Sequence, residues 1–484
     1  MMKQHGCMGA VALIAGMAAL AWAGPEAVLN VEKPAPSRGT PAVFKFGGED
    51  NQEFMLNGKP FQIRGAEMHP QRIPREYWRH RIRTARAMGL NTIAFYVFWN
   101  DHEQPDGSFD FKTGNRDLAA FLKLCQEEGM WVLFRPGPYV CGEWDLGGLP
   151  HYLLKDPKAK LRTTEDAKFM KAQARYLEAV ARVAEPFLAK NGGPILMTQL
   201  ENEYGSYQRK DPKYMEWLKT FWTRKGFGPF YTSDGAGEHY LKGVTLPGVA
   251  VGLDPGLNDG HWKIANKCNP GVPVFSSETY PGWLRHWGEG NWNPTPEIVD
   301  HVRWFMDKGR SFSLFVFHGG TNFGFTAGAN NGGPGQYQPD LTSYDYGSPV
   351  DEHGRMNEYY TRMREIILAK LPAEAAVPEP PADIPSMEIP EFTPEVHAGL
   401  WENLPRPFRS KFPQPPYFEQ WNQNQGMAIY ITAVPAGPSE TLELSSASDY
   451  AQVYLNGELI GTLDRRLGPV SYTHLRAHET RGNL

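Results

Sequence analysis

The stretch "GGPILMTQLENEYGSY", residues 192–207, closes an apolar run with an acid, an amide and an acid, namely Glu201, Asn202 and Glu203. A further carboxylate, Glu278, lies near the end of the run "PVFSSETY", residues 273–280. Two facing carboxyl groups can act as general acid and as nucleophile, which is the chemistry that cleaves a glycosidic bond with retention of configuration. Because like charges at short distance drive two protonation equilibria apart, one group would stay protonated while the other stays ionised.

The choice between the first two acids depends on their place along the strand. Glu201 and Glu203 share one side of a strand, so side-chain alternation does not distinguish them. Glu203 is nearer the loop, and catalytic groups of barrels lie at the C-terminal ends of strands, which favours Glu203 as the partner of Glu278. The same alternation predicts that Asn202 points the other way unless the strand bulges.

Eight short β-rich runs alternate with segments of helical period, and several runs are almost continuously apolar, as parallel strands buried on both faces are. Residues 50–369 are therefore predicted to form a catalytic (β/α)8 TIM barrel of the α/β class, and no G-x-G-x-x-G follows the first run to favour a doubly wound sheet. If each run is a strand, the ends of the fourth and seventh face each other across the barrel mouth. The predicted strands are residues 61–69, 91–99, 131–139, 194–203, 229–235, 248–254, 273–280 and 311–320.

Local signals place two of the helices. Leu122 and Cys125 share an apolar face before Gly129, which predicts that Cys125 packs rather than reacts. Thr163 with Asp166 can cap a long helix that is expected to reach about Lys190.

Composition limits the function. The chain has 484 residues, of which 41% are hydrophobic and 13% aromatic, enough for one large core and a smaller second one. The net charge is -5 and the chain has no block of lysines or arginines. Electrostatics therefore gives no reason to expect binding to nucleic acid or to an anionic membrane. Scattered histidines and acidic pairs without a ligand-rich loop predict no metal and no cofactor. Fourteen Trp and twenty-one Tyr suit sugar-binding surfaces, and also plain core packing.

The first segment has the pattern of a secretory signal peptide at residues 1–23, followed by an N-terminal leader at 24–49. We therefore expect the protein to be exported to the periplasm or the cell exterior, with no membrane attachment once the signal peptide is cleaved. A retained membrane anchor is the alternative, which the short apolar run disfavours. Cleavage would leave Cys125, Cys141 and Cys268, too few for a disulfide framework.

The C-terminal part differs in composition from the barrel. Residues 370–395 are rich in Pro, Ala and Glu and predict an extended linker. Residues 396–468 predict a truncated β-sandwich with a tight turn at Asn456 and Gly457. Residues 469–484 contain a segment that resembles the translation of a transposase sequencing adapter, so we expect a non-native tail in place of the rest of the sandwich. The strands expected in this part are residues 426–434, 441–446 and 451–464.

Five motifs, in order, resemble those of glycoside hydrolase family 35, the acid-type and bacterial β-galactosidases. They are "GGPILMTQLENEYGSY", "RPGPYVCGEWDLGGLP", "SSETYPGWLRHWG", "FHGGTNFGF" and "TSYDYGSP", and the similarity runs from about Phe54 to Tyr360. "AQVYLNGELIGTLDR" is similar to the family's C-terminal sandwich, a jelly roll of galactose-binding type.

The resemblance implies a retaining exo-β-galactosidase with Glu203 as acid/base and Glu278 as nucleophile. It also implies that Asn202 binds the sugar's 2-hydroxyl. Phe315 stands where the animal lysosomal members carry a Tyr, so one hydroxyl contact to galactose is expected to be missing. The other sugar contacts that the resemblance implies are Tyr96, Cys141, Gly142, Glu143, Tyr280, Trp283 and Tyr346.

Each site residue has a plainer interpretation. Glu203 and Glu278 could be structural ion-pair carboxylates, and Glu143 could be a buried partner of Arg135. Trp283 and Trp287, four residues apart, could be core residues of a helix. Cys141 could be a nucleophile, although no histidine lies in a suitable motif, and His318 is expected to be a packed, hydrogen-bonded histidine.

The expected partner is therefore a β-galactoside oligosaccharide or polysaccharide, and the oligomeric state stays open. A related exo-β-glycosidase acting on plant galactan or xyloglucan side chains is the alternative within enzymes. A non-catalytic galactoside-binding protein is the alternative outside them, and it would need neither carboxylate.

Overall fold

A computed structural model describes residues 31, 33–35, 39–290, 295–331, 336–395, 398–407, 409–410, 414–434, 441–442, 444, 449–467 and 475–476. The predicted signal peptide, residues 1–23, lies outside this set, as do the predicted leader up to residue 30 and most of the predicted tail, residues 469–484. Within the described set, none of the helices combines the length and the apolar character that a membrane span requires.

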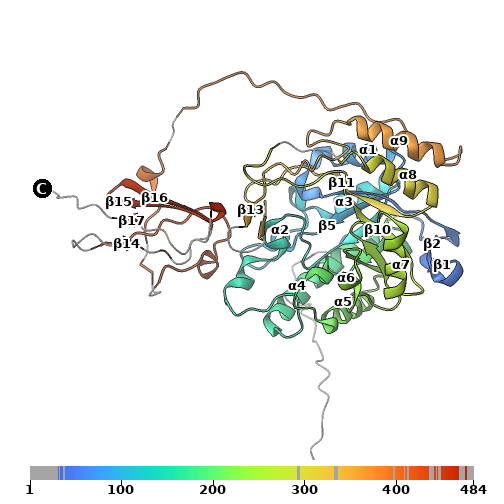
Figure 1. The fold of residues 1–484 in the computed structure, drawn as a ribbon, viewed down its shortest axis with the longest axis horizontal. Coiled ribbons are helices and arrows are strands. Elements are labelled where there is room, and N and C mark those ends of the chain that lie inside the picture. Colours follow the sequence, from blue (N-terminus) through green and yellow to red (C-terminus); the bar gives the residue numbers. More distant parts are fainter. Residues whose placement is uncertain are drawn as a thin grey trace, which may run out of the picture.

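The central element is a closed barrel of eight parallel strands, in the order β10-β11-β4-β5-β6-β7-β8-β9 (Figure 1). Each of the eight strands predicted for the barrel is present, so the predicted TIM barrel is confirmed. Most strands end earlier than their apolar runs, because the polar and proline residues after them leave the ladder for the loops. The strands are β4 Arg64–Met68, β5 Thr92–Tyr96, β6 Trp131–Arg135, β7 Ile195–Gln199, β8 Phe230–Asp234, β9 Ala250–Leu253, β10 Val274–Thr279 and β11 Phe312–His318.

Helices surround the barrel (Figure 1). The long ones are α1 Trp78–Ala87, α3 Leu118–Glu127, α4 Ala167–Ala184, α5 Pro212–Arg224, α7 Asp259–Cys268, α8 Ile298–Lys308 and α9 Glu358–Lys370, and the short ones are α2 Trp99–His102 and α6 Glu238–Leu241. Asp166 caps α4 by accepting from the backbone N–H groups of Lys168 and Phe169, whereas Thr163 donates to Asp211 instead. The predicted end of this helix near Lys190 is wrong, because Pro186 has no N–H to continue the ladder and α4 stops at Ala184.

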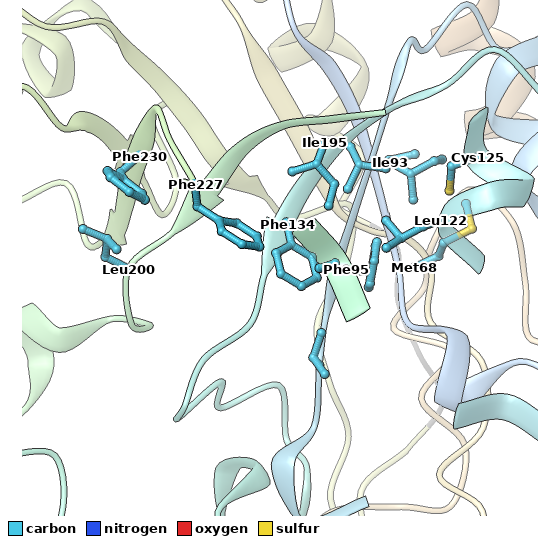
Figure 2. Close-up of a cluster of buried hydrophobic side chains, with 14 of the residues drawn as sticks. Met68, Ile93, Phe95, Leu122, Cys125, Phe134, Ile195, Leu200, Phe227 and Phe230 are labelled. Carbon is cyan, nitrogen blue, oxygen red and sulfur yellow. The ribbon is translucent and has the colours of Figure 1, made fainter. Parts of the chain in front are cut away.

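The main core lies between the outer face of the strands and the helices. Figure 2 shows Leu122 and Cys125 of α3 beside Met68 of β4 and Ile93 of β5. All four side chains are fully buried, which confirms the predicted packing role of Cys125. Burial raises the pKa of this thiol far above its ordinary value, so it stays protonated.

A small antiparallel sheet, not predicted from the sequence, packs against residues of the barrel interior. It consists of β1 Phe44–Gly47, β2 Glu53–Leu56 and β3 Lys59–Pro60. The ring of Phe54 lies 5.6 Å from that of Phe275 on β10. Because β1 falls inside the segment predicted as a leader, part of residues 24–49 belongs structurally with the barrel.

Among its described residues, the C-terminal part has two small antiparallel sheets. Strands β15 Tyr450–Leu455 and β16 Glu458–Asp464 pair through the predicted turn, with positive φ at Asn456 and Gly457. β14 Thr441–Leu442 pairs with β17 Leu475–Arg476. The strand predicted at 426–434 is wrong: no ladder forms there among the described residues, and Tyr430 instead stacks on Trp421. The boundaries of the linker, 370–395, and of the partial sandwich, 396–468, stay predictions.

A hairpin that follows the last barrel strand contacts the C-terminal part. β12 Ala329–Asn331 and β13 Tyr337–Pro339 follow β11, and β13 lies nearest the C-terminal sheets in Figure 1. Tyr337 donates a hydrogen bond of 2.8 Å to Asp449, and the guanidinium of Arg465 lies over the Tyr337 ring.

Candidate active site

The two predicted catalytic carboxylates follow the C-terminal ends of β7 and β10. Glu278 is still within β10, whereas β7 ends at Gln199 and Glu203 comes after a turn. Glu201 and Glu203 both have positive φ, 61° and 42°, so the chain leaves the strand conformation before either acid. Strand alternation therefore does not apply here, which is the exception that the prediction allowed for an interrupted strand, and the Asn202 side chain lies at the site beside Arg135 and Tyr96.

Glu201 is held in a buried ion pair. Its carboxylate accepts bonds of 2.9 Å and 2.6 Å from the Arg162 Nε and Nη2 atoms, and a bond of 2.7 Å from the Asn202 backbone N–H. Only 1% of Glu201 is exposed. This pairing leaves Glu203 as the acid of the motif that is available for chemistry.

Glu278 receives hydrogen bonds on both oxygens. Its Oε1 accepts from the guanidinium of Arg135 and lies 3.1 Å from the Tyr96 hydroxyl. Its Oε2 accepts a 3.0 Å bond from the Tyr280 hydroxyl. Burial raises the pKa of Glu278 above its ordinary value, while the charge of Arg135 opposes that rise and stabilises the ionised form.

The carboxyl group of Glu203, unlike that of Glu278, has no side chain that donates to it among the described residues. The backbone N–H of Glu203 donates to Ser233 O. Burial, with the nearby charges of Glu278, Asp234 and Glu143, raises the pKa of Glu203 to about 8. A carboxyl group in this state is protonated at neutral pH, as a general acid must be.

Asn202 shares two hydrogen-bonding partners, Arg135 and Tyr96, with Glu278. Its Oδ1 accepts from Arg135 at 2.9 Å and from Gln199 at 2.8 Å, and it lies 3.1 Å from the Tyr96 hydroxyl. With the oxygen occupied, the Asn202 amide N–H₂ is left as the donor for a bound group.

Arg135 connects the site to a buried network that the sequence analysis missed. It also donates to Glu67, whose other oxygen lies 3.1 Å from His69 Nε2. Both Glu67 and His69 are fully buried. The interpretation of Glu143 as the partner of Arg135 is wrong, because Glu143 accepts from the Tyr344 hydroxyl instead. The sequence signal for this network is a charged residue inside an apolar run, namely Glu67 in residues 61–69 and Arg135 in residues 131–139.

Aromatic rings form one wall of the site. Phe315 lies among the others, with ring centroids 5.8 Å from Tyr346, 5.9 Å from Tyr280 and 6.2 Å from Tyr96. Trp283 contacts Tyr280 edge-on at 5.2 Å and is 54% exposed. The interpretation of Trp283 and Trp287 as helical core is therefore wrong, since both are exposed and no helix contains either.

The loop Cys141–Glu143 forms another wall. All three residues have positive φ, and Gly142 O accepts a 2.5 Å bond from Arg72. Burial raises the pKa of the Cys141 thiol, which argues against a thiolate nucleophile. His318 is buried below the site, with its ring nitrogens 3.3 Å from Val350 O and Arg81 Nε, as expected for a packed histidine.

The predicted site residues thus gather at one mouth of the barrel. Comparison with known proteins shows which family has this arrangement of motifs. The model of the glycosyl hydrolases family 35 matches residues 53–370. The chain belongs to glycosyl hydrolase family 35. It is therefore a glycoside hydrolase, and the match spans the whole barrel that positions Glu203 and Glu278.

Similar proteins include several that are named for β-galactosidase. The chain is 38% identical to a β-galactosidase of Xanthomonas manihotis over 439 residues, which cover 89% of this chain and 72% of that one. It is 36% identical to β-galactosidase-1-like protein 2 of Homo sapiens, with 89% and 69% covered. It is also 36% identical to a β-galactosidase of Macaca fascicularis, with 89% and 64% covered.

The structure predicts that Arg135 stabilises this family 35 barrel as well as its site. We expect Arg135→Met to lower the free energy of unfolding by about 3–5 kcal/mol, because Glu67 and Glu278 would be left buried without their cation. Urea denaturation measures the change. Arg303→Met on α8 is the matched control: this arginine is exposed and lies 3.9 Å from Asp300, so its loss should cost at most about 0.5 kcal/mol. Equal stability of the two variants would contradict the role of Arg135.

Proposed function

We propose that the protein is a retaining exo-β-galactosidase that releases terminal, non-reducing β-D-galactose by double displacement. The single observation that carries this proposal is the contrast between the two carboxylates. Glu278 is bonded by Arg135, while Glu203 lacks a side-chain donor among the described residues and has a pKa of about 8. Both relatives named β-galactosidase share this chain's barrel region, which supports galactose as the sugar.

In the proposed first step, an oxygen of Glu278 attacks the anomeric carbon while Glu203 gives its proton to the leaving oxygen. The bond to the leaving group breaks and a covalent galactosyl ester of Glu278 forms. In the second step, Glu203 takes a proton from water, which attacks the same carbon and frees Glu278. The Asn202 amide would donate to the 2-hydroxyl, where a hydrogen bond strengthens in the transition state.

The remaining proposed contacts orient the sugar. Glu143 can accept from sugar hydroxyls, and exposed Trp283 can pack on an apolar sugar face. Phe315 offers no hydroxyl, so the neighbouring Tyr96, Tyr280 and Tyr346 are the polar groups of that wall. The proposed set is Tyr96, Cys141, Gly142, Glu143, Asn202, Tyr280, Trp283, Phe315 and Tyr346. Export of the protein is proposed from the sequence pattern of residues 1–23 alone.

The test is hydrolysis of aryl β-galactoside and aryl β-glucoside, followed by proton NMR during the first minutes. We expect galactoside-selective turnover in which β-galactose appears before its α-anomer, because two inversions restore the configuration. The α-anomer appearing first would overturn the double displacement. Equal turnover of the glucoside would favour the related exo-β-glycosidase, and no turnover of any β-glycoside would favour the galactoside-binding protein.

A further inference from the structure

A cavity of about 520 Å³ lies outside the site described above. Its walls come from the loops after β4, β5, β6 and β11, and from residues 424 and 425 of the C-terminal part. The volume falls within the roughly 300–1,000 Å³ of typical ligand sites. Neither the proposed mechanism nor the proposed galactose contacts use this cavity.

The cavity shares one wall segment with the active site. Trp144 and Asp145 line the cavity and directly follow Glu143 of the active site. The backbone N–H of Asp145 donates to Thr326 O, and that of Gly328 donates to Glu143 O, both at 2.9 Å. The two hollows therefore adjoin across residues 143–145.

Exposed aromatic rings line the cavity. Phe325 is 63% exposed and Phe323 is 43% exposed, although each side chain would gain by burial. Trp144 is held in place by stacking on Phe98, at 4.0 Å between ring centroids, and by donating a 2.9 Å hydrogen bond to Asn100. The exposed rings of Phe323 and Phe325 are suited to packing against the C–H face of a sugar, and Trp144, which is only 4% exposed, is a fixed part of the wall.

Gln71, which also lines the cavity, carries a buried acceptor without a partner in the described structure. His102 Nδ1 lies 2.8 Å from Asp110 O, a carbonyl that can only accept, so Nδ1 carries the proton. Burial lowers the pKa of His102, so the ring is neutral and its Nε2 must accept from the Gln71 amide N–H₂ at 3.1 Å. The amide orientation of Gln71 is thereby fixed, and its Oε1 finds no partner in the described structure although Gln71 is only 7% exposed.

The charges in the cavity do not suit an ionic ligand. Arg116 lies 3.2 Å from Asp101, so these two charges compensate each other. The side chain of Asn424 opposes the rise that burial causes in the pKa of Asp145, and both residues line the cavity, so the C-terminal part contributes to its wall. Amides, aromatic rings and one carboxyl group beyond the Arg116–Asp101 pair can hydrogen-bond and pack against a neutral polyhydroxyl compound.

We propose that this cavity is a second saccharide site, which binds a sugar unit of the substrate on the leaving-group side of the cleaved bond. The inference rests on the proposed function, since an exo-enzyme that holds the terminal galactose leaves the whole remaining chain on that side. The C-terminal part then contributes to substrate binding through Asn424 and Gln425, and long substrates gain contacts that an aryl galactoside lacks.

The test compares Phe325→Ala with wild type on an aryl β-galactoside and on β-1,3-, β-1,4- and β-1,6-linked galactotetraose. We expect KM for the preferred tetraose to rise about 3- to 10-fold through the lost ring contact, with the aryl galactoside unaffected. Phe392→Ala is the matched control, because this ring is 70% exposed in the predicted linker, away from the cavity lining.

Calorimetric titration measures binding without turnover. Each tetraose is titrated into three proteins: Glu278→Gln alone, Glu278→Gln with Phe325→Ala, and Glu278→Gln with Phe392→Ala. Weaker binding of at least one tetraose on adding Phe325→Ala, but not Phe392→Ala, supports the second site. Identical affinities in all three proteins for every tetraose overturn it. Failure of wild type to cleave the aryl galactoside would reject the proposed function separately, since the titration does not depend on cleavage.

Discussion

Glu278→Gln is expected to lower kcat for an aryl β-galactoside by at least about 10⁴-fold, because an amide cannot form the galactosyl ester. Glutamine has nearly the shape of glutamate, and Arg135 keeps its second carboxylate partner, Glu67. The variant should therefore fold. Initial rates with purified protein, beside a circular dichroism spectrum, measure the loss. A 2-deoxy-2-fluoro galactoside should also add its sugar mass to the wild-type peptide that contains Glu278.

The matched control is Glu201→Gln, two residues before Glu203 in the same motif. Glu201 is paired with Arg162, so its loss should destabilise the fold while lowering kcat far less than the loss of Glu278 does. A Glu278→Gln enzyme that kept wild-type kcat, or a fluorosugar label on another peptide, would exclude Glu278 as the nucleophile.

The barrel could be predicted because its strands are buried on both faces, so each appears as an almost continuous apolar run. The strand ends could not be predicted equally well. β7 was expected to reach residue 203 and stops at Gln199, because positive φ at Glu201 and Glu203 turns the chain without any glycine to indicate it. The β1–β3 sheet had a usable signal that was overlooked, the Asn57-Gly58 turn, where both residues have positive φ.

The catalytic pair was predictable from residue type and strand position, whereas its surroundings were not. The network of Arg135 with Glu67 joins residues 68 positions apart, and only the barrel brings them together. The same reason explains the wrong partner for Glu143, since Tyr344 comes from a loop about 200 residues later. The adjoining cavity depends on residues 424 and 425, which directly precede the segment 426–434 for which the sequence predicted a strand.

The pH profile should be bell-shaped because the two carboxyl groups must be in opposite states. Glu203 has to be protonated, so kcat/KM should fall as the pH rises through about 8, the pKa of this group. Glu278 has to be ionised, so activity should also fall as the pH drops through its pKa, which burial places above the ordinary value of 4.5. Initial rates between pH 4 and pH 10 measure both limbs, and the two apparent pKa values belong to the interacting pair.

Glu203→Gln tests which group gives the alkaline limb. Glutamine cannot transfer the proton, so kcat with a poor alcohol leaving group should fall by about 10²–10⁴-fold. With an activated aryl galactoside the first step needs little acid help, so water activation becomes limiting. Added azide, which needs no base, should then restore turnover and yield β-galactosyl azide. The fall in kcat/KM near pH 8 should disappear in the variant, and its persistence would assign the alkaline limb to another group.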